Sequence, residues 1–501
     1  MRTFTPEIIN TLSTVRKILL LWCLLLTPCF IFATAPIKIV VVSDTHVMAP
    51  ELLVGDGTAW QEYLAGQRKL VDYSQTLFDD MVDRIKSELK PDLVLLTGDL
   101  SKDGEVVSHQ YVVSKLGELR NAGIPVLVIP GNHDYGTNGN AVYYDGASIT
   151  PAETATAASF ATMYSHYGYD DHSQRDGTTL TYAREAVDGL VVIGIDSGRE
   201  GVVTDATLDW IAQQVADAYA AGKQVIAMMH YPLVPHFFGT DIFVASSVVS
   251  DYERVRNRLA DAGVRVVLTG HFHTTDIAKD WNADLTKEIN DVNTGSLISY
   301  PCDYRVLTLS TDRSQLQVTT EHVTSLNGVA DFPETAKERL HTAVQQAVAA
   351  RGTAYSLISP TAADAFVCHA EGDEHHSEDG ADILERLVTA AAMGKSFGML
   401  DAARAELLTN MATSMLQDIS QYGVEGRANQ TDDLTLTINL PAVTPPSHIS
   451  KLTATLGEER SIYNLNGQRL QTADRGVYVV DGQKMAVGKQ RIVSTKKNVT
   501  D

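Results

Sequence analysis

Short apolar runs that end on metal-capable side chains recur through the first half of this chain. The first run, Ile37 to Val42, is followed directly by Asp44-Thr45-His46. Four further sites lie at or just past the end of a Val/Ile/Leu-rich run: Gly98-Asp99, Gly131-Asn132-His133-Asp134, His230 and Gly270-His271-Phe272-His273. One such strand end could arise by chance, whereas five indicate a fold that gathers polar groups at the ends of its strands.

Helical patterns separate several of these runs. Apolar residues recur at helical spacing from Leu77 to Leu89, from Val112 to Leu119 and from Val255 to Leu259. Continuous apolar strands that alternate with such helices predict an α/β fold, in which helices cover the sheets. In folds of this class the functional groups gather at the carboxyl ends of the strands, where the five motifs lie. The remaining apolar runs are 93–96, 126–129, 190–195, 225–229, 264–268 and 306–309.

Two long segments interrupt this alternation. Met48 to Tyr73 follows the first motif, and Tyr135 to Asp176 follows the third. Insertions at the carboxyl ends of strands are natural substrate-facing loops, and ordinary surface decoration is the alternative.

The pattern becomes helical from about Phe332 to Tyr422, where apolar residues sit among strong helix formers. This region contains an acidic, His-rich patch, His369 to His376. Histidine tracts can bind metal, but this one has no defined ligand spacing. Two interpretations stay open: a solvated loop, or part of a helical lid that reaches the active site.

The last part of the chain predicts a small β module. Thr431 to Leu440 alternates like a strand, and the prolines that follow mark a linker. Ile462 to Leu470 is then nearly repeated by Val477 to Met485, with Asn-Gly in the first copy and Asp-Gly in the second. Both dipeptides predict tight hairpins. The module resembles the C-terminal sorting modules of exported Bacteroidetes proteins.

The amino terminus has the layout of a secretory signal peptide. Arg16 and Lys17 precede the apolar run Ile18 to Ala33, which ends on small residues. We expect cleavage near Ala33 or Ala35, and a retained membrane anchor is the alternative. Export would permit a disulfide between the two cysteines that remain, Cys302 and Cys368. Two buried thiols are the other interpretation.

The charge balance constrains the partners of the chain. The sequence of 501 residues has a formal net charge of −22, which argues against a dedicated binder of the nucleic acid backbone. A small phosphate substrate is not excluded, because bound divalent cations invert the charge locally.

The five motifs supply carboxylates, one amide oxygen and several imidazoles, without a thiolate. This mixed set suits Mn, Fe, Zn or Ni ions, and it has too many ligands for one ion. Two cations about 3.5 to 4 Å apart could hold phosphate oxygens and generate a bridging hydroxide at neutral pH. The sequence therefore predicts phosphoester hydrolysis.

The ordered motif set resembles that of the calcineurin-like metallophosphoesterases, over roughly Ile37 to Val323. The resemblance implies a four-layer α/β/β/α sandwich with two metal ions. By motif, the first metal would be bound by Asp44, His46 and His273, the second by Asn132, His230 and His271, and Asp99 would bridge the two.

The resemblance also implies roles beside the metals. His133 matches a histidine that binds phosphate or protonates the leaving oxygen, and Asp134 is placed to orient it. His236 either contacts substrate or packs in the interior. Purple acid phosphatases have a tyrosine three residues after the bridging aspartate, but Lys102 stands at that position here, which argues against a tyrosinate-bound iron centre.

These observations divide the chain into a signal peptide (1–35), a catalytic domain (36–325), a mainly helical region (326–440), a linker (441–455) and a C-terminal β module (456–501). We expect an exported enzyme, periplasmic, surface-bound or secreted, that hydrolyses a small phosphodiester by attack of a metal-bridging hydroxide. It would touch a membrane only through an uncleaved signal segment. The alternatives are a phosphomonoesterase or nucleotidase, and a cell-surface binding protein that keeps its metals without turnover.

Overall fold

The computed structural model describes residues 35–136, 139–240, 246–372, 374, 378–419 and 431–443, together with short strands between residues 462 and 493. The predicted signal peptide, most of the predicted linker and both hairpin dipeptides of the β module lie outside the described residues. Within the part of the chain that the structure describes, no helix is long and apolar enough to cross a membrane.

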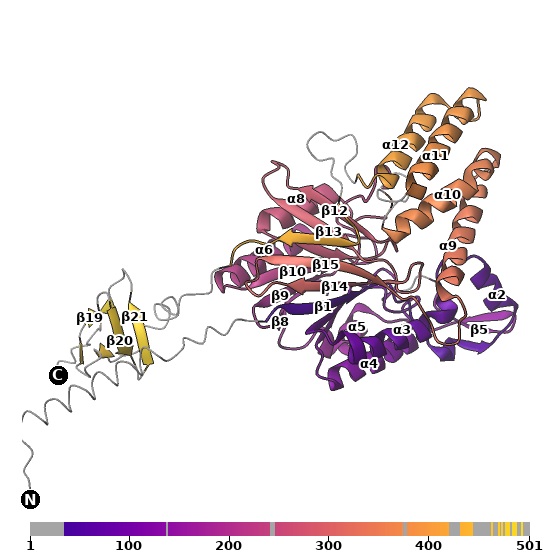
Figure 1. The fold of residues 1–501 in the computed structure, drawn as a ribbon. Helices are drawn as coiled ribbons and strands as arrows, with labels where there is room; N and C mark the ends of the chain where they lie inside the picture. Colours follow the sequence, from indigo (N-terminus) through magenta and orange to yellow (C-terminus); the bar gives the residue numbers. More distant parts are fainter. Residues whose placement is uncertain are drawn as a thin grey trace, which may run out of the picture.

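Two large sheets form the centre of the molecule (Figure 1). The strands of the first are β1 (Ile37–Val42), β3 (Leu93–Leu96), β4 (Val126–Val128), β14 (Asp303–Leu309), β15 (Gln315–His322) and β16 (Thr435–Asn439). Their order in the sheet is β16-β15-β14-β1-β3-β4. Because β1, β3 and β4 are parallel, their carboxyl ends meet at one edge of this sheet.

The second sheet has seven strands in the order β12-β13-β11-β10-β9-β8-β7. These strands are β7 (Gln174–Arg175), β8 (Tyr182–Val187), β9 (Leu190–Ile195), β10 (Gln224–Met229), β11 (Val266–Thr269), β12 (Asp276–Trp281) and β13 (Glu288–Asn293). Its four central strands, β9, β10, β11 and β13, are parallel.

Alternate side chains of β10 show how the layers stack. Ile226 and Met228 are buried in the core that contains β1 and β3, whereas Val225, Ala227 and Met229 are buried in a separate core. That separate core also contains apolar side chains of α6 (Asp205–Ala220) and α8 (Tyr252–Ala262). The second sheet therefore lies between the first sheet and these two helices.

Helices α3 (Ser74–Arg84), α4 (Val106–Asn121) and α5 (Ala157–Met163) belong to the first core, and a helical turn, η3 (Ile85–Leu89), continues α3. The predicted four-layer α/β/β/α sandwich is confirmed. The predicted apolar runs became strands with boundaries within a few residues, and the three predicted helical patterns fall in α3 with η3, in α4 and in α8.

The two predicted insertions meet in space. Strand β2 (Leu53–Gly55), from the first insertion, pairs with β5 (Val142–Asp145), from the second, and β6 (Ser148–Pro151) completes a three-stranded sheet. Helix α2 (Thr58–Ala65) packs beside it through Trp60, whose ring contacts that of Tyr144. Both insertions therefore form regular secondary structure. Short turns η1 (Pro50–Leu52), η2 (Val71–Tyr73) and η4 (Ser165–Tyr167) fill the rest.

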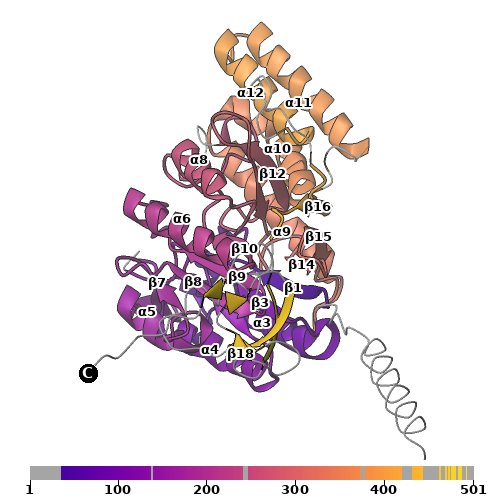
Figure 2. The same cartoon turned by 90° about the vertical axis from the view of Figure 1, so that its left-hand side faces the viewer.

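The helical region consists of four helices that stand to one side of the sandwich (Figures 1 and 2). They are α9 (Phe332–Ala349), α10 (Thr353–Glu371), α11 (Glu378–Ser396) and α12 (Ala402–Leu416). After α12 the chain returns to the sandwich, because β16 pairs antiparallel with β15. The helices thus form an insertion between two neighbouring strands of one sheet, and a domain boundary at residue 325 cuts that sheet.

Of the two predicted hairpins, the second has the register of a two-residue turn, with Val480 opposite Gln483, whereas the first pairs Tyr463 with Arg469, which is not the register of a two-residue turn at 466–467. β17 (Ile462–Tyr463) is antiparallel to β18 (Arg469–Leu470), and β20 (Gly476–Val480) is antiparallel to β21 (Gln483–Val487). β17 also pairs with β20, which joins the two hairpins in one sheet, and β19 (Thr472–Ala473) pairs with β22 (Ile492–Val493).

Cys302 and Cys368 are buried in different clusters. They are not joined by a disulfide, as the interpretation of two buried thiols expected.

Candidate metal centre

The loops that follow β1 and β3 run side by side and carry the first two motifs. The backbone N–H of Asp44 donates to the carbonyl of Gly98 at 3.1 Å, and that of His46 donates to the carbonyl of Asp99 at 2.9 Å. The N–H of His271 donates to Oδ2 of Asp44 at 2.9 Å, which joins the last motif to the first. Main-chain hydrogen bonds therefore fix where these side chains lie.

The predicted ligands converge in two groups that share one residue. Asp44, His46, Asp99 and His273 form the first group, and Asp99, His230 and His271 form the second, with the ligand atoms of each group within 4.8 Å of one another. Oδ1 of Asn132 joins the second group, 3.0 Å from Nε2 of His230 and 2.9 Å from Nδ1 of His271. All seven predicted ligands thus lie together.

The glycines of the motifs make this convergence possible. A Cβ on Gly98 would lie 2.6 Å from Nδ1 of His230, and φ of Gly98 is +97°. A Cβ on Gly131 would collide with the Asp99 carboxylate, and one on Gly270 with the side chains of Ser43 and Asp44. Only glycine lets the backbone approach these ligands so closely.

The backbone of the centre is strained. Five of the seven predicted ligands have left-handed φ angles: Asp44 (50°), His46 (37°), Asp99 (50°), His271 (69°) and His273 (63°). Such conformations cost about 1–3 kcal/mol each outside glycine and cluster at functional sites. Each ligand sits at a sharp change of chain direction just past its strand, so that its side chain turns into the shared space.

Backbone carbonyls define which ring nitrogen two of the histidines present. Nδ1 of His230 lies 2.9 Å from the carbonyl of Thr97, and Nε2 of His271 lies 2.9 Å from the carbonyl of Ser246. A carbonyl only accepts, so these nitrogens carry the protons. Nε2 of His230 and Nδ1 of His271 are then left to face Asn132 and Asp99, as in histidine ligands held by outer hydrogen bonds.

The electrostatics favour neutral imidazoles at three ligands. Burial lowers the pKa of His271 to about 3 and that of His273 to about 4, and it lowers the pKa of His46 well below its ordinary value. At His230 the carboxylates of Asp99 and Asp44 outweigh burial and raise the pKa to about 9. Because a ligand histidine must be neutral, metal uptake at His230 has to displace a proton.

Several buried polar atoms of the first group lack a protein partner. Oδ1 of Asp44 has no hydrogen-bond donor among the described residues, and Nε2 of His46 faces Nε2 of His273 at 3.2 Å. These two nitrogens, on neutral imidazoles, and the carboxylate oxygen point at one another. A cation between them would be bound by all three atoms. The donor sets therefore suit two metal ions that share Asp99.

His133 lies at the edge of the centre, with Nδ1 2.8 Å from Oδ1 of Asp103. Burial lowers its pKa, but the carboxylates of Asp99 and Asp103 outweigh this effect and the net shift is upward. Asp134 does not touch the ring. Its carboxylate instead accepts from the N–H groups of Gly131, Leu100 and Ser101 and from the Ser101 hydroxyl.

The predicted role of Asp134 as the partner of His133 is therefore corrected to Asp103. Asp134 points back into the loops, because four donors surround it there and it is fully buried. A signal for Asp103 existed in the sequence, since it is an acidic residue four positions after Asp99. Asp103 is held in turn by the buried ammonium of Lys102, whose Nζ also lies 3.4 Å from Oε1 of Glu105.

His236 packs in the interior. It is 1% exposed, its Nδ1 lies 3.1 Å from Oδ2 of Asp276, and its ring stacks on Phe272. It does not line the cavity described below, so the predicted contact with substrate is not seen. His369 of the His-rich patch is also buried and contacts Glu374, so this part of the patch is not a solvated loop.

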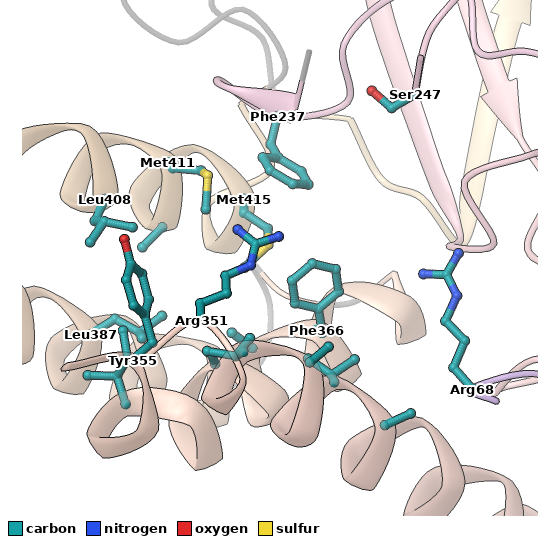
Figure 3. Close-up of a pocket in the computed structure, with 18 of the residues that line it drawn as sticks. Arg68, Phe237, Ser247, Arg351, Tyr355, Phe366, Leu387, Leu408, Met411 and Met415 are labelled. Atoms are coloured by element: carbon teal, nitrogen blue, oxygen red, sulfur yellow. The ribbon is translucent and has the colours of Figure 1, made fainter. Parts of the chain in front are cut away.

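A large cavity opens above the metal centre (Figure 3). Its volume is about 1060 Å³, and its floor includes Asp99, Asn132, His133, His271 and His273. Its walls are mostly apolar side chains of the four helices, including Val348, Phe366, Leu387, Leu408, Met411 and Met415. The helical region therefore does reach the active site, as the second interpretation of this region expected.

Arg68 and Lys69 line the same cavity beside the metal ligands, and Figure 3 shows Arg68 across the cavity from Arg351 and Tyr355. Sequence analysis missed both residues. They are the only basic residues in the insertion Met48 to Tyr73, and this was the sequence feature that could have identified them. These two side chains place positive charge beside the metal ligands, which a phosphomonoester could use as well as a diester.

Comparison with known proteins agrees with this geometry. Residues 37–275 match the family model described as calcineurin-like phosphoesterase. This segment is therefore similar to the calcineurin-like phosphoesterases. The match indicates a hydrolase of phosphoester bonds, and the two ligand groups that share Asp99 suit two metal ions.

Two relatives match nearly half of this chain. A probable cyclic nucleotide phosphodiesterase of Fibrobacter succinogenes is 21% identical over 240 residues, which are 48% of this chain and 73% of that protein. A cAMP/cGMP dual specificity phosphodiesterase of Mycobacterium tuberculosis is 23% identical over 46% of this chain and 60% of its own length. A solved dimetal phosphatase from Danio rerio is 14% identical over 57% of this chain and 97% of its own, with a TM-score of 0.41.

Proposed function

We propose that this chain is an exported, metal-dependent phosphodiesterase whose substrate carries an apolar group on one side of phosphorus. The apolar cavity that opens on the ligand cluster is the observation that carries this proposal. Export rests on the signal-like amino terminus and on the resemblance of the C-terminal module to sorting modules. Phosphodiester hydrolysis is supported by the names of the relatives, which act on cyclic nucleotides.

Several large apolar side chains in the cavity wall are strongly exposed to solvent. Leu357 is 68% exposed, Phe397 69% and Met393 52%, and all three line the cavity. Contiguous exposed apolar surface marks a binding site in most soluble proteins. An alkyl or aromatic group of the substrate would cover these side chains while the phosphate lies on the ligand cluster.

Two divalent cations bound by the two ligand groups would neutralise phosphate oxygens and supply an activated water. Arg68 and Lys69 would bind the oxygen atoms that the ligand cluster leaves exposed, since both line the cavity beside it. His133 would donate a proton to the departing alkoxide from Nε2, because Nδ1 is engaged by Asp103. The Asp103 carboxylate stabilises the imidazolium that this step requires.

A phosphomonoesterase is the second candidate, and Arg68 with Lys69 favours it. Two cations beside the site would suit the extra negative charge of a monoester. A monoester product of the diesterase reaction would place the same charge there, so both activities predict a role for these residues. The two candidates differ in which substrate is turned over faster.

Chain-length dependence tests the proposal. Alkyl p-nitrophenyl phosphates with methyl, hexyl and dodecyl groups are compared with p-nitrophenyl phosphate on metal-loaded protein. We expect kcat/KM to rise with chain length, by at most about fourfold for each methylene, since a buried CH₂ contributes about 0.8 kcal/mol. Faster turnover of the monoester would favour the second candidate, and equal rates for all three diesters would remove the apolar group from the proposal.

A matched pair of surface variants tests whether the dependence of kcat/KM on chain length arises in the cavity. Phe397→Glu places a charge in the cavity wall, and Ile149→Glu places one at a similarly exposed apolar residue of β6. Phe397→Glu should lower kcat/KM for the dodecyl diester and leave the methyl diester unchanged. Ile149→Glu should change neither.

A further inference from the structure

Three buried aspartates from distant parts of the chain meet below the helical region. Asp276 begins β12, Asp418 follows α12 and Asp433 precedes β16. One carboxylate oxygen of each lies within 4.8 Å of the others, and the residues are 1%, 3% and 0% exposed. Buried carboxylates at such distances are costly unless a positive charge compensates them.

Among the described residues, oxygen atoms of Asp276 and Asp433 lack hydrogen-bond donors, whereas Oδ2 of Asp418 accepts from the N–H of Thr431 at 2.9 Å. Oδ1 of Asp433 accepts from the N–H of Ile277 at 2.5 Å, but its Oδ2 has no donor among the described residues. The same holds, within the described part of the chain, for Oδ1 of Asp276 and for Oε2 of the neighbouring Glu374. Each of these side chains is at least 99% buried, so water does not replace the missing donors at an open surface.

The described cationic side chains nearest to Asp276 and Asp433 do not reach their unpaired oxygens. The guanidinium of Arg305 donates to the backbone carbonyls of Asp433 and Asn293 and to the hydroxyl of Thr320, rather than to the carboxylates. His236 and His369 approach only Oδ2 of Asp276, at 3.1 and 3.9 Å. Oδ1 of Asp276 and Oδ2 of Asp433 are therefore buried without a donor among the described residues.

The repulsion is large enough to change proton affinity. Burial, and after it the charges of Asp276 and Glu374, raises the pKa of Asp418 to about 9. The same causes raise the pKa of Asp433 well above its ordinary value. Either protons or a metal ion must be present at this point at neutral pH.

We propose that Asp276, Asp418 and Asp433 bind a calcium ion. All three offer hard carboxylate oxygens, which calcium prefers, and it accepts irregular sites built mostly from protein. One oxygen of each aspartate lies within 4.8 Å of the others, which is close enough for a single calcium ion with oxygens at about 2.3–2.6 Å to contact all three. Magnesium demands a smaller, near-ideal octahedron and usually keeps several waters, which suits a fully buried group less well.

A calcium ion at this site would link the helical region to the sandwich. Asp418 ends the α12 segment, and β12, which begins with Asp276, follows closely on the metal ligand His273. Helix α10 ends at the same point, because Gly372, with φ of +68°, packs so tightly that a Cβ would lie 2.8 Å from Cγ2 of Thr275 and 3.2 Å from Cβ of Asp433. Calcium would thus hold the two helices that carry much of the cavity wall in place.

Metal analysis of the full chain tests this site separately from the catalytic centre. Protein is stripped with a chelator, loaded with calcium chloride alone, desalted, and measured for bound calcium and for Tm. The wild type and Asp99→Asn should each keep one calcium ion per chain and gain several degrees in Tm. Asp433→Asn and Asp418→Asn should lose both responses, whereas Asp432→Asn, a neighbouring half-buried aspartate, should keep them.

The wild type alone decides the question if a variant fails to fold. Absence of calcium binding and of any calcium effect on wild-type Tm would overturn the proposal. So would an Asp433→Asn variant that is more stable than the wild type in the presence of calcium, since removal of a carboxylate that binds the ion should lower Tm. A response to zinc or manganese without one to calcium would overturn the choice of ion. None of these outcomes depends on phosphoesterase activity.

Discussion

Nδ1 of His133 lies 2.8 Å from Oδ1 of Asp103, a residue thirty positions earlier in the chain. Asp103 is fixed by Lys102, which is 0% exposed and also lies over the ring of Tyr63 at 5.1 Å. The insertion that carries Tyr63 is therefore part of the support of His133. Asp103 acts through the histidine, so we regard it as a positioning residue.

Asp103→Asn should lower kcat by about 10- to 100-fold, as for other residues that orient a catalytic group. His133→Ala should lose at least as much. The double variant should lose no more than His133→Ala, because Asp103 has no function once the ring is gone. The kcat of each variant with bis-p-nitrophenyl phosphate checks this, and Tm controls for the loss of the Lys102 contact. Additive losses in the double variant would show that Asp103 acts independently.

Metal content should separate the two ligand groups. Asp99→Asn should reduce bound transition metal from two ions per chain to almost none, because Asp99 belongs to both groups. Asn132→Ala removes a side chain of the second group only, so it should leave one ion. Elemental analysis of protein loaded with manganese gives the counts. Loss of both ions in Asn132→Ala would mean that the groups fill only together.

Gly131→Ala should abolish metal binding, although it adds one methyl group. Its Cβ would occupy the space of the Asp99 carboxylate. Gly117→Ala is the control, since its Cβ in helix α4 would meet only Oη of Tyr167 at 3.9 Å. That change should be neutral or stabilise the chain by up to about 1 kcal/mol, because alanine is the better helix former. Metal counts and Tm are measured for both variants.

Arg68→Ala and Lys69→Ala should each lower kcat/KM by about 10- to 100-fold. A hydrogen bond to a charged group contributes about 1.5–3 kcal/mol, and 1.4 kcal/mol corresponds to a factor of ten. Metal content should not change, because neither residue belongs to a ligand group. Arg84→Ala in α3, which does not line the cavity, is the control and should keep full activity. Unchanged kcat/KM in both cavity variants would remove them from phosphate binding.

The alternation of strands and helices predicted an α/β fold with polar groups gathered at strand ends, and the resemblance to the calcineurin-like metallophosphoesterases added the four-layer sandwich and the set of seven ligands. Strand ends followed by Asp, Asn or His are local signals, and parallel pairing brings them to one edge. The carboxylate that contacts His133 could not be predicted in the same way. Asp103 and Asp134 are both acidic and both near the motifs, and only the backbone donors around Asp134 decide which of them turns away.

The residues of the cavity were beyond sequence analysis for a different reason. Arg68, Phe366 and Met411 come from segments far apart in the chain, and no periodicity indicates that they face the same space. The buried carboxylates were hidden in the same way. Asp276 and Asp433 are 157 positions apart, and neither lies in a motif.

The pairing of β15 with β16 has a consequence for the order in which the chain can fold. During synthesis, β15 emerges before the four helices, and its partner emerges after them. Until then β15 is an exposed edge strand with free backbone donors and acceptors, which is a template for pairing with other chains. A shortened protein that stops before Thr435 would keep every predicted metal ligand and still present this edge permanently, so aggregation rather than lost chemistry should limit its use.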